Sequence, residues 1–529
     1  MPLRSYRVHR YVNAFCPQCH EERPDQPLSD VERLSGYLAE EDGRVWLVRG
    51  CPRHGRITTL YDEVPEILSY LEEWTAPTKA HIPDSPGNFD PVPSTYLRGL
   101  GEMQTQHSCI LLEDVVQDCN LRCPTCFADS APGQGGVVPL TTVLANVDQR
   151  LARENGKLDV VMVSGGEPTL HPDLLALLSA LADRPINRIL LNTNGIRIAK
   201  DDGLLQFLHE QRDRIEIYLQ YDGQRAETSR HLRGGDVVRF KEEAVDRLSQ
   251  AGVFTTLVMT AALGVNDDEI GDVVRRCFAT PYVAGVNIQP VFGSGRISGI
   301  DPTNRLTHTG ALARLGPQTD GLVDWQDLTA LPCSHPHCCS VGYFVKTDKD
   351  EWRSLTRIIG HEQMKEYLGL VSNRIGRYDL TPQIATLVRE SMTDLLSNQA
   401  SMASPKVWQL LRDVCENCDL GMTTLVRLTG ELMMGSRRKS RQLMADRVKR
   451  LSVKPFMDIN TMLEERLTQC CVHVGTARDL ASGDDAHQCA PFCAVQAWGP
   501  LSDQKLSRRA QTIALPTPRP VRSTSEVTR

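Results

Sequence analysis

The sequence predicts an α/β protein, with a partial (β/α)6 barrel between a small N-terminal metal-binding domain and a mostly helical, Cys-rich C-terminal domain. From about residue 107 to 312, short apolar runs alternate with amphipathic stretches, a pattern typical of parallel βα units. Polar or glycine-rich segments directly follow the apolar runs, where parallel sheets place their active sites. The cysteines gather in three parts of the chain. A doubly wound sheet is the alternative that the same alternation allows.

The chain has 529 residues, too many for one compact core. We expect an N-terminal domain and linker at 1–98, the barrel at 99–312, the Cys-rich domain at 313–501 and a disordered tail at 502–529. The net charge of −7 gives no nucleic-acid signature, and no apolar run is long enough to span a membrane. Seventeen cysteines without a secretory signal indicate metal binding in a reducing compartment. The expected location is therefore the cytoplasm, with at most peripheral membrane contact and no nucleic-acid partner.

Six strands are predicted in the barrel region, each a short run of apolar residues: 109–116, 159–163, 188–192, 215–219, 254–259 and 286–290. Amphipathic helices are predicted between them at 140–152, 172–182, 204–211, 237–251 and 267–277. A further short strand is predicted at 44–49 in the N-terminal domain.

The first barrel strand leads into Cys119-Asn120-Leu121-Arg122-Cys123-Pro124-Thr125-Cys126. Three thiolates at this spacing can bind three irons of a cubane cluster and leave the fourth iron without a protein ligand. An iron without a protein ligand can bind a reacting molecule. A catalytic zinc keeps an open coordination position for the same purpose. A structural zinc knuckle is the alternative interpretation.

The second barrel strand ends at Ser164-Gly165-Gly166-Glu167-Pro168-Thr169. Glycines let the backbone approach a ligand closely, so bare N–H and C=O groups can contact it. A plain strand-to-helix turn is the alternative.

Together, these two motifs resemble the radical S-adenosylmethionine (SAM) enzymes. The resemblance implies that Cys119, Cys123 and Cys126 hold a [4Fe-4S] cluster that chelates the amino and carboxylate groups of SAM and cleaves it reductively. It also implies that the glycine-rich segment contacts the methionyl end of SAM, through Ser164, Gly165, Gly166, Glu167 and Pro168. There is one departure from the family pattern. Thr125 stands where the family usually has an aromatic residue near the adenine, and Phe127 follows instead.

Three polar residues follow the next two strands: Asn192, Asn194 and Gln220. By the resemblance they are candidates for hydrogen bonds to the ribose or carboxylate of SAM, and as single polar residues they are equally candidates for turn formers. Gly293-Ser294-Gly295-Arg296 follows the sixth strand and is expected either to shape the substrate mouth or to be a flexible loop. No catalytic acid or base can be assigned from the sequence.

The N-terminal region contains a Cys-x2-Cys pair and a Cys-x2-His pair: Cys16, Cys19, Cys51 and His54. Two such pairs suit a tetrahedral mononuclear site with a structural role, holding zinc or rubredoxin-like iron. The fourth ligand is His54 or a more distant cysteine.

Nine cysteines follow residue 313: Cys333, Cys338, Cys339, Cys415, Cys418, Cys470, Cys471, Cys489 and Cys493. Because two closed cubanes need eight thiolates, this number predicts two auxiliary [4Fe-4S] clusters. A zinc-rich accessory domain is the alternative. Cys109 and Cys277 lie within strand or helix patterns and are expected to be buried spectators.

A narrower resemblance covers roughly residues 10–500. The motifs Cys-Pro-x-Cys, Cys-Pro-x-His-Gly, Pro332-Cys333-Ser334-His335-Pro336, Pro455-Phe456-Met457-Asp458, Cys470-Cys471-Val472-His473 and Pro491-Phe492-Cys493 occur in this order. In this they resemble the radical SAM subfamily that includes archaeal tetraether lipid synthases and proteins named as dihydro-hydroxymethylpterin methyltransferases. The chain departs from that pattern at 477–488, which lengthens the stretch before Cys489.

The resemblance implies a radical SAM enzyme that takes electrons from an external donor such as a ferredoxin or flavodoxin. The expected outcome is C–C bond formation on a lipid chain, and the alternative is methylation of a pterin-like heterocycle. A non-catalytic iron–sulfur or zinc scaffold is the alternative from another class. Two basic runs, Arg437-Arg438-Lys439-Ser440-Arg441 and 447–450, are expected to be a solvated helix face or to meet lipid phosphates.

Overall fold

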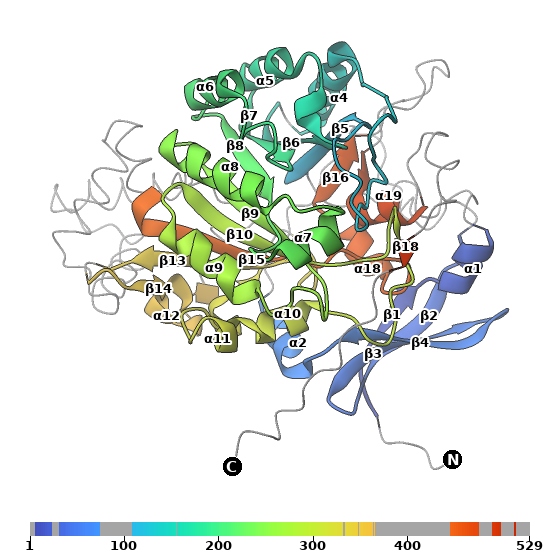
Figure 1. Cartoon of the computed structure of the whole chain (residues 1–529). Coiled ribbons are helices and arrows are strands. Elements are labelled where there is room, and N and C mark those ends of the chain that lie inside the picture. The colour runs from blue at the N-terminus through green and yellow to red at the C-terminus, as the bar shows by residue number, and fades with distance from the viewer. Residues whose placement is uncertain are drawn as a thin grey trace, which may run out of the picture.

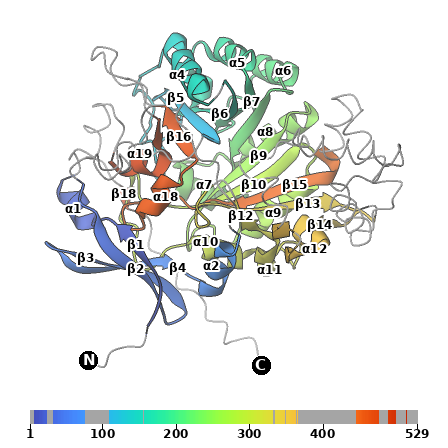
Figure 2. The ribbon, with the colours of Figure 1, turned by 180° about the vertical axis from the view of Figure 1, so that it is seen from behind.

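The computed structural model describes residues 6–23, 31–74, 108–154, 156–331, 334–347, 349–362, 364–365, 445–475, 489–498 and 513–514. Several predicted features lie outside these residues: the linker at 76–98, Cys333, Cys415, Cys418, the basic run 437–441 and all of the tail except residues 513–514. Figures 1 and 2 show the described elements from opposite sides.

The N-terminal region is a four-stranded antiparallel sheet in the order β1-β2-β3-β4. Its strands are β1 (Arg7–Ala14), β2 (Leu34–Glu41), β3 (Arg44–Cys51) and β4 (Gly55–Asp62), with α1 (Pro17–Glu22) and α2 (Pro65–Glu72) attached. Only β3 was predicted. The β2–β3 turn is Asp42-Gly43, and both residues have positive φ, at 52° and 69°. Asp-Gly is a strong signal for such a two-residue hairpin, so this turn was readable from the sequence.

The barrel strands form the centre of a second, larger sheet. All six predicted strands are present: β5 (Ile110–Val116), β6 (Leu158–Gly165), β7 (Ile186–Thr193), β8 (Ile215–Gln220), β9 (Thr255–Ala261) and β10 (Val283–Pro290). Each is parallel to the next, and their order in the sheet follows the chain without reversal. A doubly wound sheet needs such a reversal, so this alternative is excluded.

The five predicted barrel helices are also present: α4 (Leu140–Arg153), α5 (Leu174–Ala182), α6 (Asp202–Glu210), α8 (Val238–Gln250) and α9 (Ile270–Ala279). They lie along one face of the sheet (Figure 1). One further helix, α7 (Ala226–Arg233), was not predicted.

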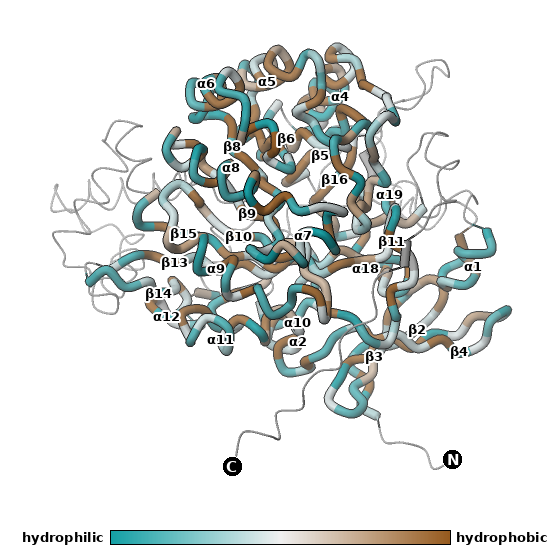
Figure 3. Tube along the Cα trace, viewed as in Figure 1, coloured by the Kyte–Doolittle hydropathy of each residue, from teal (hydrophilic) through white to brown (hydrophobic). Residues whose placement is uncertain are grey.

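Period-2 alternation gives the large sheet two faces with different partners. Leu111, Val161 and Ile189 belong to the core that packs under the helices. Their neighbours Leu112, Met162 and Leu190 face the other way, into a core shared with C-terminal residues. Strand β9 is hydrophobic in its middle, at Leu257-Val258-Met259 (Figure 3), as expected for a strand covered on both faces.

The described C-terminal residues extend this sheet at both edges. On one side are β12 (Thr329–Ala330), β13 (Ser340–Lys346), β14 (Trp352–Ser354) and β15 (Val448–Val453), and β15 is parallel to β10. On the other side β16 (Val472–Gly475) is parallel to β5 and pairs with β17 (Cys489–Pro491). The prediction of a mostly helical C-terminal domain at 313–501 is therefore wrong for the described residues, which add strands to both edges of the sheet. The physical reason is that the two edges of an open barrel expose unpaired backbone groups, which these strands satisfy.

Shorter helices complete the C-terminal half: α10 (His308–Ala313), α11 (Leu315–Gln318), α12 (Leu355–Ile359), α18 (Glu464–Thr468) and α19 (Phe492–Trp498). Two residues of the predicted disordered tail, β18 (Ile513–Ala514), pair with β11 (Ile297–Ser298). Among the helices that the structure describes, none combines the length and apolar character needed to cross a membrane.

Candidate active site

The cysteine loop, residues 117–130, follows β5 at the carboxyl ends of the barrel strands. Cys119, Cys123 and Cys126 line a pocket with an empty volume of about 830 Å³. Six of the other predicted residues of this site line the same pocket: Gly165, Gly166, Glu167, Asn192, Asn194 and Gln220. The predicted residues Ser164 and Pro168 are not among its lining residues. The topology therefore brings together motifs that are up to 101 positions apart in the sequence, from Cys119 to Gln220.

The two glycines allow close contact with the cysteine loop. A Cβ atom on Gly165 would lie 2.3 Å from the Val116 carbonyl oxygen, and one on Gly166 would lie 2.2 Å from that of Asp118. Gly165 also has φ of +124°, a conformation that side chains oppose. The Gly166 N–H donates to Val116 O at 2.6 Å, and the Glu167 N–H donates to Asp118 O at 2.9 Å. The glycine pair thus positions the cysteine loop, in addition to leaving bare backbone beside the pocket.

Glu167 joins the ends of two neighbouring strands. Its buried carboxylate accepts hydrogen bonds from Thr193 Oγ1 at 2.6 Å and from the Asn194 N–H at 2.7 Å. It also caps the short helix η3 (Pro168–Leu170) by accepting from the Thr169 N–H at 3.1 Å. Much of the hydrogen-bonding capacity of this carboxylate is therefore used within the protein.

The amide side chains at the next strand ends form a connected set. Asn192 Nδ2 donates to Ser164 Oγ at 3.0 Å, and Gln220 Nε2 donates to Asn192 Oδ1 at 2.9 Å. Asn194 Nδ2 donates to Asn120 Oδ1 at 2.6 Å, which links β7 to the cysteine loop. Asn194 Oδ1 also accepts from the Ile196 N–H, so this residue forms a turn and lines the pocket at the same time.

The loop after β10 supports the cysteine loop from another side. A Cβ atom on Gly295 would lie 2.3 Å from the Phe127 carbonyl oxygen. The buried Arg296 guanidinium donates to Cys123 O at 2.5 Å and to Ser130 O at 2.7 Å, and the Arg296 N–H donates to Cys126 O at 2.9 Å. This segment was expected to shape the substrate mouth or to be flexible. The structure shows instead that Arg296 clasps the backbone of the cysteine loop.

Arg233, at the end of α7, is a pocket residue that the sequence interpretation missed. Its guanidinium donates to both carboxylate oxygens of Asp222, at 2.6 and 2.5 Å, and to Gln220 Oε1 at 3.1 Å. Thr125 Oγ1 donates to the Leu232 carbonyl at 2.9 Å, so the residue that departs from the family pattern fixes the end of α7. Gly234, with φ of +76°, is a typical glycine after a helix end and was the available signal.

The electrostatics of the cysteine loop suit a bound metal cluster. Burial raises the pKa of Cys119 to about 12 and also raises the pKa of Cys126, although the Arg296 charge opposes the latter shift. Buried thiolates therefore need a nearby cation to persist. The Leu121 N–H donates to Cys119 Sγ and the Ser130 N–H donates to Cys126 Sγ, each at 3.4 Å. Three sulfurs beside an open pocket, with N–H donors to two of them, fit a cluster that has one free iron.

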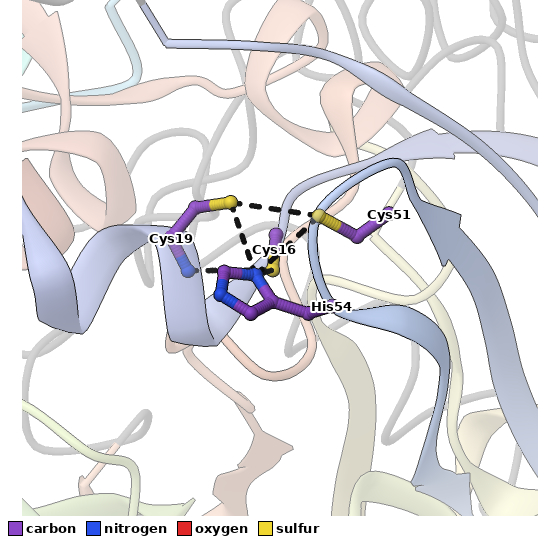
Figure 4. Close-up of side chains that lie close together, drawn as sticks. All are labelled: Cys16, Cys19, Cys51 and His54. Carbon is purple, nitrogen blue, oxygen red and sulfur yellow. Dashed lines mark hydrogen bonds between the residues drawn. The ribbon is translucent and has the colours of Figure 1, made fainter.

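The N-terminal cysteines and His54 form a compact tetrad (Figure 4). Their four ligand atoms all lie within 4.8 Å of one another. His54 Nδ1 is 3.3 Å from Cys16 Sγ, 3.4 Å from Cys19 Sγ and 3.5 Å from Cys51 Sγ. Such separations fit a tetrahedron around one zinc or iron ion with bonds of about 2.0–2.3 Å. The geometry thus favours His54 as the fourth ligand.

A carboxylate orients the histidine of this tetrad. His54 Nε2 lies 2.8 Å from Glu22 Oε1, which leaves Nδ1 facing the cysteines. Ligand histidines commonly use their second nitrogen in this way. Burial raises the pKa of the Cys51 thiol, but N–H donors from Arg53 and His54 outweigh it and lower the pKa to about 6. Thiolate character at Cys51 favours metal binding.

Five C-terminal cysteines line another pocket, the pocket of the C-terminal cysteines, with an empty volume of about 540 Å³: Cys338, Cys339, Cys470, Cys471 and Cys493. Two basic residues, Lys454 and Arg466, line it as well. Arg466 Nε donates to Cys338 Sγ at 3.3 Å. Cys489 lies in β17. Cys109 and Cys277 are fully buried in the two cores, as expected for spectators.

Comparison with known proteins decides the family. Residues 115–277 match the radical SAM superfamily, and residues 8–63 match a domain described as the HMPTM N-terminal zinc ribbon domain. The chain is a radical SAM enzyme. It is 25% identical over 511 residues to a 7,8-dihydro-6-hydroxymethylpterin dimethyltransferase of Methanocaldococcus jannaschii, covering 91% of this chain and 92% of the relative. It is 26% identical over 174 residues to a GTP 3′,8-cyclase of Sulfurovum, covering 31% of this chain and 49% of the cyclase.

Two solved structures resemble parts of this radical SAM chain. One is SuiB of Streptococcus suis bound to S-adenosylmethionine, at 18% identity, a TM-score of 0.31 and coverage of 37% of this chain and 43% of SuiB. The other is a radical SAM methyltransferase of Sphaerobacter thermophilus, at 13% identity, a TM-score of 0.30 and coverage of 60% and 75%.

Proposed function

We propose that this enzyme uses SAM to methylate a carbon of a pterin-like heterocycle. One observation carries the proposal: three cysteines of a radical SAM motif face a pocket that adjoins a second, larger cavity inside the sheet. The relative that matches along nearly the whole chain is named as a methyltransferase of a pterin, which supports this substrate class. An external one-electron donor, such as a ferredoxin or flavodoxin, completes the system.

Three groups of cysteines would hold metal. Cys119, Cys123 and Cys126 would hold the [4Fe-4S] cluster that binds SAM. Cys16, Cys19, Cys51 and His54 would hold a structural zinc or iron ion in the ribbon. The cysteines around the pocket of the C-terminal cysteines, with those outside the described residues, supply enough thiolates for two auxiliary clusters. We therefore expect about three four-iron clusters and about one mononuclear ion per chain.

When held by Cys119, Cys123 and Cys126, a reduced [4Fe-4S] cluster would supply the electron that cleaves SAM into methionine and a 5′-deoxyadenosyl radical. The protein has to orient SAM and keep its reactive carbon away from water. By the resemblance, backbone groups from Ser164 to Pro168 would lie beside the methionyl end, and Gly165, Gly166 and Glu167 of this segment line the pocket. The side chains of Asn192, Asn194 and Gln220 would offer amides to the ribose or carboxylate. Arg233, held by Asp222, would place its charge opposite the SAM carboxylate. Its tether prevents the guanidinium from swinging away.

Methylation replaces one hydrogen atom of the substrate. The substrate carbon loses that hydrogen, with one electron, to the 5′ carbon, which yields 5′-deoxyadenosine and a substrate radical. The radical then gains a methyl cation equivalent from a second SAM and one further electron from the external donor. The net result is a C–H bond converted to a C–CH3 bond.

The expected C–C bond formation between lipid chains stays a prediction, because the matched relatives are not named for it. The basic run 437–441, which was expected to meet a lipid surface, lies outside the described residues. The non-catalytic scaffold alternative is wrong, because the chain is a radical SAM enzyme.

Product analysis tests the proposed function. The anaerobically reconstituted enzyme is incubated with SAM, a one-electron reductant and 7,8-dihydro-6-hydroxymethylpterin. We expect 5′-deoxyadenosine together with a pterin product heavier by one or more methyl groups, and neither product from C123A. Deoxyadenosine formation that responds to a phospholipid and not to the pterin would contradict the proposal in favour of the lipid alternative.

A further inference from the structure

The second cavity lies between two pockets. One is the pocket beside Cys119, Cys123 and Cys126, called here the SAM-side pocket, and the other is the pocket of the C-terminal cysteines. Its empty volume is about 960 Å³. It shares Phe127, Asn192, Gln220 and Gln289 with the SAM-side pocket. It shares Cys339, Lys454, Phe456 and Phe492 with the pocket of the C-terminal cysteines. A molecule in this cavity would therefore contact both metal regions, which makes it the place for substrate.

One wall of the second cavity is apolar and aromatic. Strands β5, β6 and β7 contribute Ile110, Leu112, Met162 and Leu190. Three phenylalanines complete it: the Phe127 and Phe492 rings are 5.6 Å apart and the Phe456 and Phe492 rings are 4.5 Å apart. Such a wall offers flat surfaces for stacking a ring.

Another part of the cavity lining is polar. Gln289 Nε2 donates to Tyr218 Oη at 2.8 Å, and Asn287 also hydrogen-bonds to this phenol. Ser452 Oγ lies 3.2 Å from Asn287 Oδ1. Amide groups fixed in this way can recognise the donor and acceptor edge of a heterocycle with little loss of entropy. A purely hydrocarbon chain would leave these polar groups without new partners.

The charge of the second cavity has one sign. Among its lining residues within the described chain, the only ionised side chains are Arg450 and Lys454, and neither Asp nor Glu lines it. Arg450, Ser452 and Lys454 are spaced at period 2 along β15 and one residue past its end, so all three present side chains to the same face of the strand. The Lys454 N–H donates to the Ile288 carbonyl at 2.8 Å, which fixes the backbone there. Two cations in a partly enclosed space attract an anion strongly.

We propose that Arg450, Ser452 and Lys454 form an anion subsite for a phosphate or carboxylate substituent of the substrate. The substrate is then a planar heterocycle with an anionic substituent, stacked on the phenylalanine wall and read by the amides. This inference rests on the proposed function and narrows its substrate class. It assigns the charge-bearing end of the substrate to β15, on the side away from the cysteine loop.

Lys454 also lies beside candidate metal ligands, and the test separates the two roles. Its Nζ is 5.5 Å from the centre of the Phe456 ring, and it lines the pocket of the C-terminal cysteines. If Lys454 only balanced thiolate charge there, its replacement would lower the iron content and leave substrate binding unchanged.

Calorimetric binding to the reconstituted full-length enzyme tests the subsite. The probes are 7,8-dihydro-6-hydroxymethylpterin and its phosphate ester, each titrated anaerobically without reductant. We expect the ester to bind at least tenfold more tightly to the native enzyme, with a preference that weakens at high salt. In R450M/K454M we expect both probes to bind within about twofold of each other, with native iron content. The matched control K346M removes a lysine of neighbouring β13 that does not line the second cavity and should keep the tenfold preference.

Each outcome decides the inference. Equal affinity of the native enzyme for the two probes overturns the anion subsite, while methylation of the unesterified pterin would leave the proposed function standing. Lower iron content in the double variant with an unchanged preference also overturns it. If neither pterin binds but phosphatidylglycerol in detergent does, with loss in the double variant, the anion subsite is supported and the pterin function fails. Binding of none of these probes overturns both.

Discussion

The two best-defined candidate metal sites of this enzyme differ in closure. In the ribbon, four ligand atoms surround one point, and the His54 ring completes the tetrahedron. In the cysteine loop, only three sulfurs are present, and the fourth direction opens to the SAM-side pocket. A closed set of ligands suits a structural ion, and an open set leaves a position for a reacting molecule. On the proposed assignment, cysteine ligands serve two purposes in one chain.

The two regions also differ in what holds them. The ribbon ligands come from a short stretch of chain, and α1 and the β3–β4 turn position them. The cysteine loop depends on distant segments: the glycine pair at the end of β6, the end of α7 and the hydrogen bonds from Arg296. Mutations far from the cysteines should therefore affect the open site and leave the closed one intact.

Cysteine substitutions should separate the two regions most strongly. We expect C123A to lower SAM cleavage by more than about a thousandfold while the mononuclear ion stays bound, because only the open site reacts. We expect C51A to lose the mononuclear ion and to lower the melting temperature, with SAM cleavage retained by the folded fraction. Metal analysis and deoxyadenosine assays on both variants measure this. Equal loss of cleavage in the two variants would remove the distinction.

A methyl group at the glycine pair should break the open site from a distance. In G166A the added Cβ would meet the Asp118 carbonyl at 2.2 Å, so the cysteine loop must shift at a cost of about 1–3 kcal/mol. We expect reduced iron content and reduced SAM cleavage with normal occupancy of the ribbon. G235A is the control, because no atom lies within 4 Å of its new Cβ. Normal iron content in G166A would show that the contact does not position the loop.

Loss of the Arg296 clasp should have a smaller effect. R296M keeps much of the side-chain volume but removes the donors to the Cys123 and Ser130 carbonyls. We expect slower cluster reconstitution and several-fold lower activity, since buried carbonyls lose their partners. R230M alters an exposed arginine of α7 and serves as the control. If R296M reconstitutes at the native rate, the loop does not need this support.

The strand that carries the cysteine loop should make stability depend on pH. Burial raises the pKa of Glu113 on β5 from 4.5 to about 8. The folded state therefore binds more protons than the unfolded state between these values, and the free energy of unfolding falls as pH rises through 8. We expect E113Q to flatten this fall in denaturant titrations from pH 6 to 9. An identical pH profile for native protein and E113Q would exclude Glu113 as the cause.

The sequence predicted the elements whose signals are local. Six strands and five helices of the barrel were readable from apolar periodicity, and the ribbon and loop cysteines from their spacing. The support of the open site was not readable, because it depends on tertiary contacts. Arg296 was predicted to lie in a segment that shapes the substrate mouth or is a flexible loop, and α7, with its Arg233, lacked a strong apolar stripe. The C-terminal strands were missed for a similar reason. Short runs such as β16 become strands by pairing with barrel edges that the sequence does not display.

Quantifying 5′-deoxyadenosine and methionine tests the central claim most directly. The reconstituted native enzyme and C123A are incubated with SAM and a one-electron reductant under anaerobic conditions. The account predicts equal amounts of the two products from the native enzyme and none above background from C123A. Equal product formation by C123A, or none by a native enzyme with a full complement of iron, would contradict it.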